Sequence, residues 1–429
     1  MEPPVRVVLV LDHAHINGGQ AKVAIESALG LSGRGHPVTV FAAVGPVDPR
    51  LAAAGIEVVC LGQPDIDQAR GAGAKLAFAA QVMWNRRAEA VLGRLLAACP
   101  RDETVVHVHA FAKALSPSVF RAVAASGLPA LYTMHEFFLV CPNGGFYDYQ
   151  RGEICRRRPM SAACVTTNCD MRSYPRKAMR VARHALLDHV ARWPDAVRDV
   201  AVISDLQAEV SRPYLKGARL HRLDNPISAP DLGPKPTDAP LGPALFVGRL
   251  STEKGVGLFA EAARLAGLRP VIVGDGPDAD AIRARYPEAE LVGWRGPDEV
   301  RALMRRARAL VFPSIWYEGQ PLTVYEALAV GTPVVVSDAC AGREAVADGQ
   351  TGFWFRSGDA ADLAAKLTAL QDDGLARAMA RAAHARYWAD PLTLDRHLDR
   401  LVALYAGLRR EHPAAASGPV PAVEAALAG

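Results

Sequence analysis

The feature that most constrains the fold is a repeated alternation of short apolar runs with longer helical patterns. The first run, Val5–Leu11, is continuous and β-branched, and a glycine pair and a helical pattern over residues 20–32 follow it. Continuous apolar strands that alternate with helices indicate a parallel sheet covered on both faces. Further strands of this first sheet are predicted at residues 38–42, 56–61, 105–109, 130–134 and 201–203.

The same alternation restarts in the second half of the chain. Residues 226–243 are proline-rich with little periodicity, which predicts a linker. We therefore predict two facing doubly wound α/β domains, at residues 1–225 and 244–390, with ligands bound between the carboxyl ends of their strands. The strands of the second domain are predicted at residues 244–247, 270–273, 290–292, 309–312 and 333–337, and its last helices at 359–371 and 375–387.

The ends and the composition of the chain add further expectations. Residues 391–412 predict a helix with no evident packing partner, and the Ala/Pro-rich residues 413–429 predict a disordered tail. A net charge of +4 argues against a nucleic-acid partner. Because no apolar run approaches the roughly 20 residues that cross a bilayer and no secretory signal is evident, we expect a cytoplasmic protein with reduced cysteines.

The strongest functional motif runs from Ser314 to Pro333, S-I-W-Y-E-G-Q-P-L-T-V-Y-E-A-L-A-V-G-T-P. A strand is expected to end near residue 312 and a helix to begin near Pro321, so the N–H groups of Leu322 and Thr323 face a ligand from the positive end of the helix. Glu318 and Glu326 lie on either side of that helix start. Two carboxylates can accept paired hydrogen bonds from vicinal sugar hydroxyls, whereas the alternative is a capping carboxylate and a solvated glutamate.

A second motif, F-V-G-R-L-S-T-E-K-G, spans residues 246–255. It places Arg249 and Lys254 at the carboxyl end of a strand, where two cations suit a diphosphate whose charge grows as it leaves. Solvated surface cations are the alternative interpretation.

Three weaker signals lie in the first half of the chain. The pair Gly18-Gly19 follows the first strand and allows close backbone approach to a phosphate, although a tight turn would also use it. His135, in Y-T-M-H-E, follows a buried strand, and His109 ends an earlier one. Both histidines are thus expected at the ligand-binding edge, although a lone histidine is more often structural.

The motif E-G-Q-P-L-T-V-Y-E-A-L-A-V-G-T-P-V resembles the paired-glutamate motif of the family-four retaining glycosyltransferases, and G-R-L-S-T-E-K-G resembles their diphosphate-binding motif. The resemblance implies the GT-B fold, catalysis without a metal or cofactor, and a nucleotide-sugar donor linked to UDP, GDP or ADP. It implies catalytic roles for His135, Arg249, Lys254 and Glu318. It also implies substrate contacts from Gly18, Gly19, His109, Gly319, Gln320, Pro321, Leu322, Thr323 and Glu326.

A cysteine- and arginine-rich insertion at about residues 137–180 departs from the common pattern of that family. Its cysteines, Cys141, Cys155, Cys164 and Cys169, lack a usual C-x-x-C spacing, so free thiols are favoured over structural zinc or an iron–sulfur cluster. The basic residues of the insertion predict either a solvated surface or a site for an anionic lipid headgroup or an acceptor phosphate. These residues are Arg156, Arg157, Arg158, Arg172, Arg176, Lys177, Arg180 and Arg183.

The sequence therefore predicts a retaining glycosyltransferase acting on a sugar or lipid-linked acceptor in cell-surface glycan synthesis, in possible peripheral contact with an anionic membrane. A sugar-nucleotide epimerase of similar architecture is one alternative, and a non-enzymatic carbohydrate-binding protein is another. A nicotinamide-dependent oxidoreductase is disfavoured because the G-x-G-x-x-G fingerprint is missing. The pair Asp278 and Asp280 has the D-x-D spacing of a metal-held diphosphate but falls at a predicted helix start.

Overall fold

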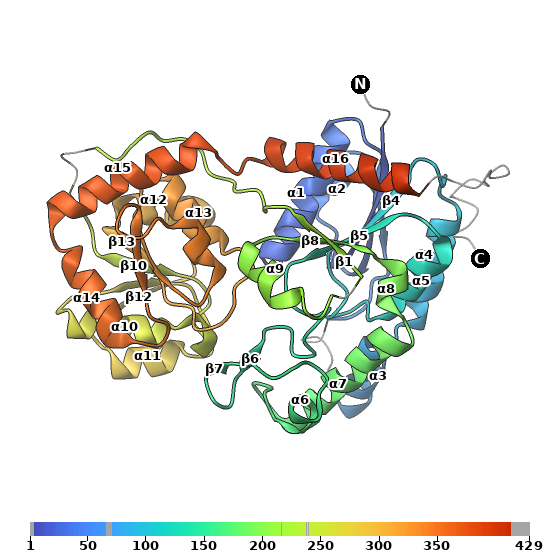
Figure 1. The fold of residues 1–429 in the computed structure, drawn as a ribbon, viewed down its shortest axis with the longest axis horizontal. Coiled ribbons are helices and arrows are strands. Elements are labelled where there is room, and N and C mark those ends of the chain that lie inside the picture. Colours follow the sequence, from blue (N-terminus) through green and yellow to red (C-terminus); the bar gives the residue numbers. More distant parts are fainter. Residues whose placement is uncertain (1–3, 66–70, 216, 237, 239, 413–429) are drawn as a thin grey trace.

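Two parallel β-sheets, each covered by helices, organise the chain (Figure 1). The computed structural model describes residues 4–65, 71–215, 217–236, 238 and 240–412. The predicted two-domain α/β fold is confirmed. The predicted tail at residues 413–429 lies outside the described residues.

The first sheet has the strand order β3-β2-β1-β4-β5-β8-β9, and all its pairings are parallel. Its strands are β1 (Arg6–His13), β2 (Val38–Val44), β3 (Glu57–Cys60), β4 (Thr104–Val108), β5 (Ala130–Met134), β8 (Asp199–Val202) and β9 (Arg219–Arg222). The helices of this half are α1 (Gly19–Gly33), α2 (Pro49–Ala53), α3 (Ala72–Met83), α4 (Arg86–Ala97), α5 (Ser118–Ser126), α6 (Ala162–Thr166), α7 (Tyr174–His189), α8 (Trp193–Ala196) and α9 (Asp205–Ser211).

The second sheet has the order β12-β11-β10-β13-β14-β15 and is also parallel. Its strands are β10 (Ala244–Val247), β11 (Val271–Val273), β12 (Glu290–Gly293), β13 (Ala309–Phe312), β14 (Val334–Ser337) and β15 (Gly352–Phe355). The remaining helices are α10 (Val256–Leu265), α11 (Ala279–Arg285), α12 (Pro297–Arg306), α13 (Leu322–Ala329), α14 (Ala360–Ala369), α15 (Asp373–Ala389) and α16 (Leu394–Glu411).

Strand β1 shows how the first sheet is buried on both faces. Val8 and Val10 pack into one apolar cluster with α4 and α5, while Val7 and Leu9 pack into the other with α1 and α16. Successive side chains of a strand point to opposite faces, so a strand buried on both sides must be apolar at every position. The uninterrupted apolar run in the sequence therefore has a direct structural cause.

Two strands of the two large sheets were not predicted from the sequence, and both lie at sheet edges. β9 has the sequence RLHR and closes the first sheet, whereas β15, GFWF, closes the second. An edge strand pairs on one side only and stays partly exposed, so it carries a weaker apolar signal than a central strand. Between Arg222 and Ala244, no helix or strand occurs among the described residues.

The last helix, α16, returns to the first domain (Figure 1). Its apolar residues Leu398, Leu401 and Tyr405 join the cluster beneath α1. His397 hydrogen-bonds Ser27 at 3.1 Å, and Arg34 forms ion pairs with two aspartates of α16. The helix pattern at the end of the sequence thus belongs to the first domain in space.

The insertion after β5 forms a lobe below the first sheet in Figure 1, and its first part packs into an apolar cluster of that domain. It contains the antiparallel pair β6 (Tyr147–Asp148) and β7 (Glu153–Ile154), followed by α6 and α7. None of the helices that the structure describes is both long and apolar enough to cross a membrane.

Candidate active site

Glu318 lies in the loop between β13 and α13, at the junction of the two domains. Its Oε1 atom accepts hydrogen bonds from Lys254 Nζ at 2.7 Å, Ser314 Oγ at 2.7 Å and Trp316 Nε1 at 2.8 Å. Burial alone would raise the pKa of Glu318, but Lys254 and the hydrogen bonds lower it below its usual range. The sequence motifs predicted both charged residues, and the structure brings them into direct contact.

Arg249 also has a carboxylate partner, which the sequence did not single out. Its Nη2 atom lies 2.5 Å from Oε1 of Glu253, and Ser251 Oγ donates to the same oxygen at 2.7 Å. Glu253 is fully buried, whereas the Arg249 side chain is 55% exposed. The buried carboxylate therefore holds one terminal nitrogen of the Arg249 guanidinium, while more than half of the side chain stays exposed.

Helix α13 begins at Leu322, with Pro321 as the residue that precedes its first turn. The first N–H groups of an α-helix have no partner within the helix, so the amides of Leu322 and Thr323 can bind anionic or hydroxyl-rich groups. Glu326 lies one turn further along. It is partly buried, and burial raises its pKa despite the opposing effect of Lys22.

The glycine pair of the first domain faces this helix. Gly18 precedes α1 with an extended backbone, and a Cβ atom on Gly19 would lie 3.6 Å from Leu322 Cδ1. The amino ends of α1 and α13 therefore approach one another across the junction. This places the predicted glycine loop beside the predicted paired-glutamate motif.

Three neighbouring strands of the second sheet end in glycines that touch through their backbones. Gly248 N donates to Val273 O at 3.0 Å, and Gly274 N donates to Gly293 O at 2.9 Å. A Cβ atom on Gly274, whose φ is 133°, would lie 1.9 Å from Gly248 O, so no other residue fits there. The result is a flat strip without side chains, next to Trp294, which is 73% exposed.

His109 and His135 lie together at the carboxyl edge of the first sheet. His109 Nδ1 is 3.0 Å from His135 Nε2, and His109 Nε2 is buried without a partner in the described part of the chain. Burial lowers the pKa of His135 to about 3 and that of His109 well below its usual value. A Cβ atom on Gly319 would lie 3.2 Å from the His135 carbonyl oxygen. Neutral imidazoles thus stand beside the loop that carries Glu318.

Gln320 has a structural partner that the sequence did not predict. Its Oε1 accepts from Asn225 N at 2.6 Å, and its Nε2 donates to Asn225 O at 3.4 Å. Both polar ends of the amide thus bind the segment that joins the domains. A second junction contact comes from Glu344, which accepts from the N–H groups of Asp205 and Leu206 at the start of α9.

All seven cysteines are free thiols in the structure. Lys177 Nζ lies between two of the four insertion cysteines, 3.1 Å from Cys169 Sγ and 3.6 Å from Cys164 Sγ. Among the described residues, no group of three or more His, Cys, Asp or Glu side chains is arranged to hold a metal ion. A structural metal bound by Cys141, Cys155, Cys164 and Cys169 was the less favoured alternative from the sequence and stays untested.

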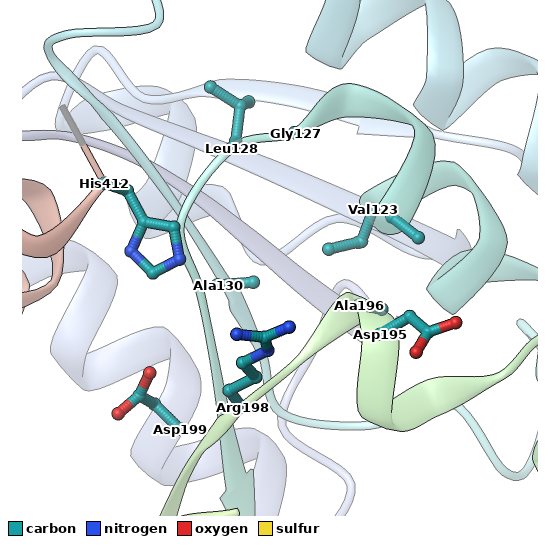
Figure 2. Close-up of a pocket in the computed structure, with 10 residues that line it drawn as sticks. Val123, Gly127, Leu128, Ala130, Asp195, Ala196, Arg198, Asp199 and His412 are labelled. Carbon is teal, nitrogen blue, oxygen red and sulfur yellow. The ribbon is translucent and has the colours of Figure 1, made fainter. Parts of the chain in front are cut away.

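A pocket of about 280 Å³ lies at the opposite edge of the first sheet (Figure 2). Ala130 and Asp199, which line it, are the first residues of β5 and β8. Asp199 is already bound to Arg219 and His221. Because ligands of open α/β sheets bind at the carboxyl ends of the strands, this pocket is separate from the candidate active site.

Residues 243–373 match the family described as "Glycosyl transferases group 1". A glycogen synthase from Mycobacterium tuberculosis is 40% identical over 163 residues, which cover 35% of this chain and 39% of that protein. A D-inositol 3-phosphate glycosyltransferase from Thermomonospora curvata is 35% identical over 208 residues, covering 43% and 47%. The chain thus spans less than half the length of these relatives.

Solved structures of similar fold cover almost the whole chain. Anabaena HepE, solved in complex with UDP and glucose, superposes with a TM-score of 0.60 at 16% identity, covering 94% of this chain and all of that one. A sucrose-phosphate synthase from Thermosynechococcus elongatus gives a TM-score of 0.62 at 17% identity, covering 95% of this chain and all of that one. These similarities confirm the predicted GT-B fold.

Proposed function

Starting from a group 1 glycosyltransferase domain at residues 243–373, we propose that the protein transfers a sugar from a nucleotide-sugar donor to an acceptor. One observation carries the proposal. Lys254, Glu318 and the amino end of α13 converge at the domain junction, where the glycine pair and His135 approach them from the first domain. A donor bound there has an anionic group, a hydroxyl-rich group and a second domain within reach.

The donor diphosphate is proposed to lie against Arg249 and Lys254. Each cation is held by a carboxylate, Arg249 by Glu253 and Lys254 by Glu318. Because Glu318 lies beside the proposed diphosphate position, the Lys254 ammonium can move from its carboxylate to a phosphate oxygen over a short distance. The donor sugar would then accept and donate hydrogen bonds at Glu318 and at the α13 amides. Glu326, one turn further along, is placed for the ribose hydroxyls, which a carboxylate can bind in pairs.

Departure of the nucleoside diphosphate develops negative charge on its outer phosphate. Arg249, Lys254 and the α13 amides stabilise that charge electrostatically, which needs neither a proton donor nor a metal ion. The acceptor hydroxyl attacks from the face of the leaving phosphate, which takes up its proton, so the sugar keeps its anomeric configuration. His135 is neutral and acts by hydrogen bonding to the sugar.

The names of the relatives support the donor class. HepE was solved with UDP and with UDP-glucose, and other relatives are named as mannosyltransferases dependent on GDP-mannose. We propose a UDP-, GDP- or ADP-linked sugar for this protein. Trp294, exposed beside the glycine strip, is placed to stack on the nucleobase.

The acceptor is proposed to be an anionic or lipid-linked glycan precursor, bound at the cytoplasmic face of a membrane. The insertion presents exposed arginines together with exposed apolar side chains. Met171 is 48% exposed and Tyr174 is 43% exposed, and they alternate with Arg172 and Arg176. Basic residues interleaved with apolar ones suit an anionic lipid surface.

The test is hydrolysis of a panel of UDP-, GDP- and ADP-sugars by the purified protein with EDTA present, followed by addition of candidate acceptors. We expect release of one nucleoside diphosphate, and its loss in Lys254→Ala and Glu326→Ala. Lys366→Ala, on the distant helix α14, serves as the matched control and keeps full activity. An epimerase would convert the sugar without releasing the nucleotide, and a binding protein would leave every donor intact.

A further inference from the structure

The insertion holds a lysine buried among thiols, which we name the Lys177 thiol site (Lys177, Cys164 and Cys169). Lys177 lies in the first turn of α7 and is 0% exposed. Its Nζ atom is 3.1 Å from Cys169 Sγ and 3.6 Å from Cys164 Sγ. Among the described residues, Lys177 forms no ion pair with a carboxylate.

This arrangement is an unusual way to bury a lysine. A buried ammonium is costly unless it is paired and hydrogen-bonded, and a thiol sulfur is only a weak acceptor. Burial alone would lower the pKa of Lys177, but the neighbouring cysteines outweigh burial and raise it above its usual value. For Cys169 the effects are reversed, because burial raises its pKa and Lys177 opposes that rise. The Lys177 nitrogen and the Cys169 sulfur therefore lie in hydrogen-bonding contact in a buried site, and each influences the protonation of the other.

The surroundings hold the two atoms together. Asn143 Nδ2 donates to the Cys169 carbonyl at 2.8 Å, which fixes the chain at Cys169 against the start of the insertion. Cys169 is 4% exposed and Cys164 is 6% exposed, so both sulfurs are largely shielded from large oxidants and alkylating reagents. Two oxidisable groups held in contact in such a site favour reaction with each other over reaction with solvent species.

We propose that Lys177 and Cys169 are the site of a covalent nitrogen–oxygen–sulfur crosslink formed with dioxygen. The Lys177 ammonium first gives up one proton, and the resulting amine and the Cys169 thiol react with one O₂ molecule. One oxygen atom bridges Sγ and Nζ, and the other leaves as water with one hydrogen from sulfur and one from nitrogen. Sulfur and nitrogen together give up the four electrons that reduce O₂. Cys169 is the partner because its sulfur is closer to Nζ than that of Cys164.

The crosslink would fasten the insertion to α7 next to the candidate active site. A Cβ atom on Gly145 would lie 2.9 Å from the Trp316 ring, and Trp316 donates to Glu318. The lobe that carries the site therefore packs directly against the loop of the second domain. Formation of the crosslink depends only on the geometry of Lys177 and its neighbouring sulfurs and is independent of the transferase activity.

The test is the intact mass of the full-length protein, purified once in air and once under argon with dithiothreitol. The aerobic protein should be heavier by about 14 Da, for one oxygen gained and two hydrogens lost, with one titratable thiol fewer. Dithiothreitol should reverse both changes. Peptide mapping of the wild-type protein should join the peptides that contain Lys177 and Cys169, which requires no variant to fold.

Variants assign the atoms. Lys177→Arg and Cys169→Ser should lose the mass gain, while Cys164→Ser should keep it. Cys99→Ser, a buried thiol in the first-domain core, is the matched control and should also keep it. An unchanged mass would overturn the proposal. So would a loss of about 2 Da, which marks a disulfide or a direct sulfur–nitrogen bond, and so would a bound metal ion in native mass spectra.

Discussion

Removal of Lys254 should expose how strongly Glu318 depends on its ion pair. Their side chains are only 23% and 11% exposed, and the Nζ to Oε1 distance is 2.7 Å. Replacing Lys254 with Met keeps most of the side-chain volume but leaves a buried carboxylate without its cation. Ser314 and Trp316 still donate to that carboxylate, so the loss concerns its charge more than its hydrogen bonds.

The magnitude follows from the geometry. Breaking a fully buried ion pair by removing one partner costs roughly 3–5 kcal/mol, and the remaining hydrogen bonds and partial exposure reduce that cost. We expect Lys254→Met to lower the free energy of unfolding of the second domain by about 2–4 kcal/mol. Adding Glu318→Gln removes the unpaired charge, so the double variant should be more stable than Lys254→Met alone.

The assay is urea unfolding followed by tryptophan fluorescence, since Trp316 contacts Glu318 directly. The midpoint should fall in Lys254→Met with an unchanged denaturant slope. Lys366→Met is the control, because Lys366 and Asp362 form a more exposed pair at 4.0 Å, and it should change stability by less than about 0.5 kcal/mol. If Lys254→Met also stays within that range, or if the double variant is the less stable one, the reasoning is refuted.

Three further predictions concern pH, the nucleobase and the membrane. The folded pKa of His135 is lowered to about 3, so the stability that its neutral form contributes is present above about pH 6.5 and decreases as the pH falls toward 3. His135→Gln should therefore reduce the dependence of the urea midpoint on pH in that window. An unchanged slope would contradict this. Trp294→Ala should weaken binding of the nucleoside diphosphate roughly 5- to 150-fold in a calorimetric titration, the equivalent of about 1–3 kcal/mol of stacking. Trp354→Ala is the control and should bind as the wild type does. Equal affinities of the two variants would reject the stacking. The double variant Arg172→Ala with Arg176→Ala should bind phosphatidylserine vesicles more weakly by about 2 kcal/mol, near 1 kcal/mol per arginine, as measured by sedimentation. High salt should abolish the difference. Arg381→Ala, on α15, is the control, and equal sedimentation of all three proteins would argue against a membrane role for the insertion.

The central strands and the charged motifs could be predicted from the sequence because their physical causes are local. A strand such as β1 is apolar throughout since both faces are covered, and the motif around Glu318 combines a strand end, a loop and a helix start within a few residues. The resemblance of Arg249 and Lys254 to a known motif depended on the same short-range spacing.

What could not be predicted depends on contacts between distant parts of the chain. Glu253 was indistinguishable from a surface glutamate until the fold buried it beside Arg249. The Gln320 amide is bound by Asn225, which is 95 residues away. In the sequence, Lys177 was one of many basic residues in the insertion, whereas in the structure it is buried in contact with two cysteine sulfurs. No spacing rule in the sequence encodes these partners.

The return of α16 to the first domain affects how the two halves can move. The chain passes between the domains at residues 223–243 and again between α15 and α16, so two separate connections join the two domains. Two tethers at separate points suppress twisting about a single connection and leave rotation about the line that joins them as the least hindered motion. We therefore expect opening and closing of the junction to follow mainly a rotation about that line, one end of which lies just before α16.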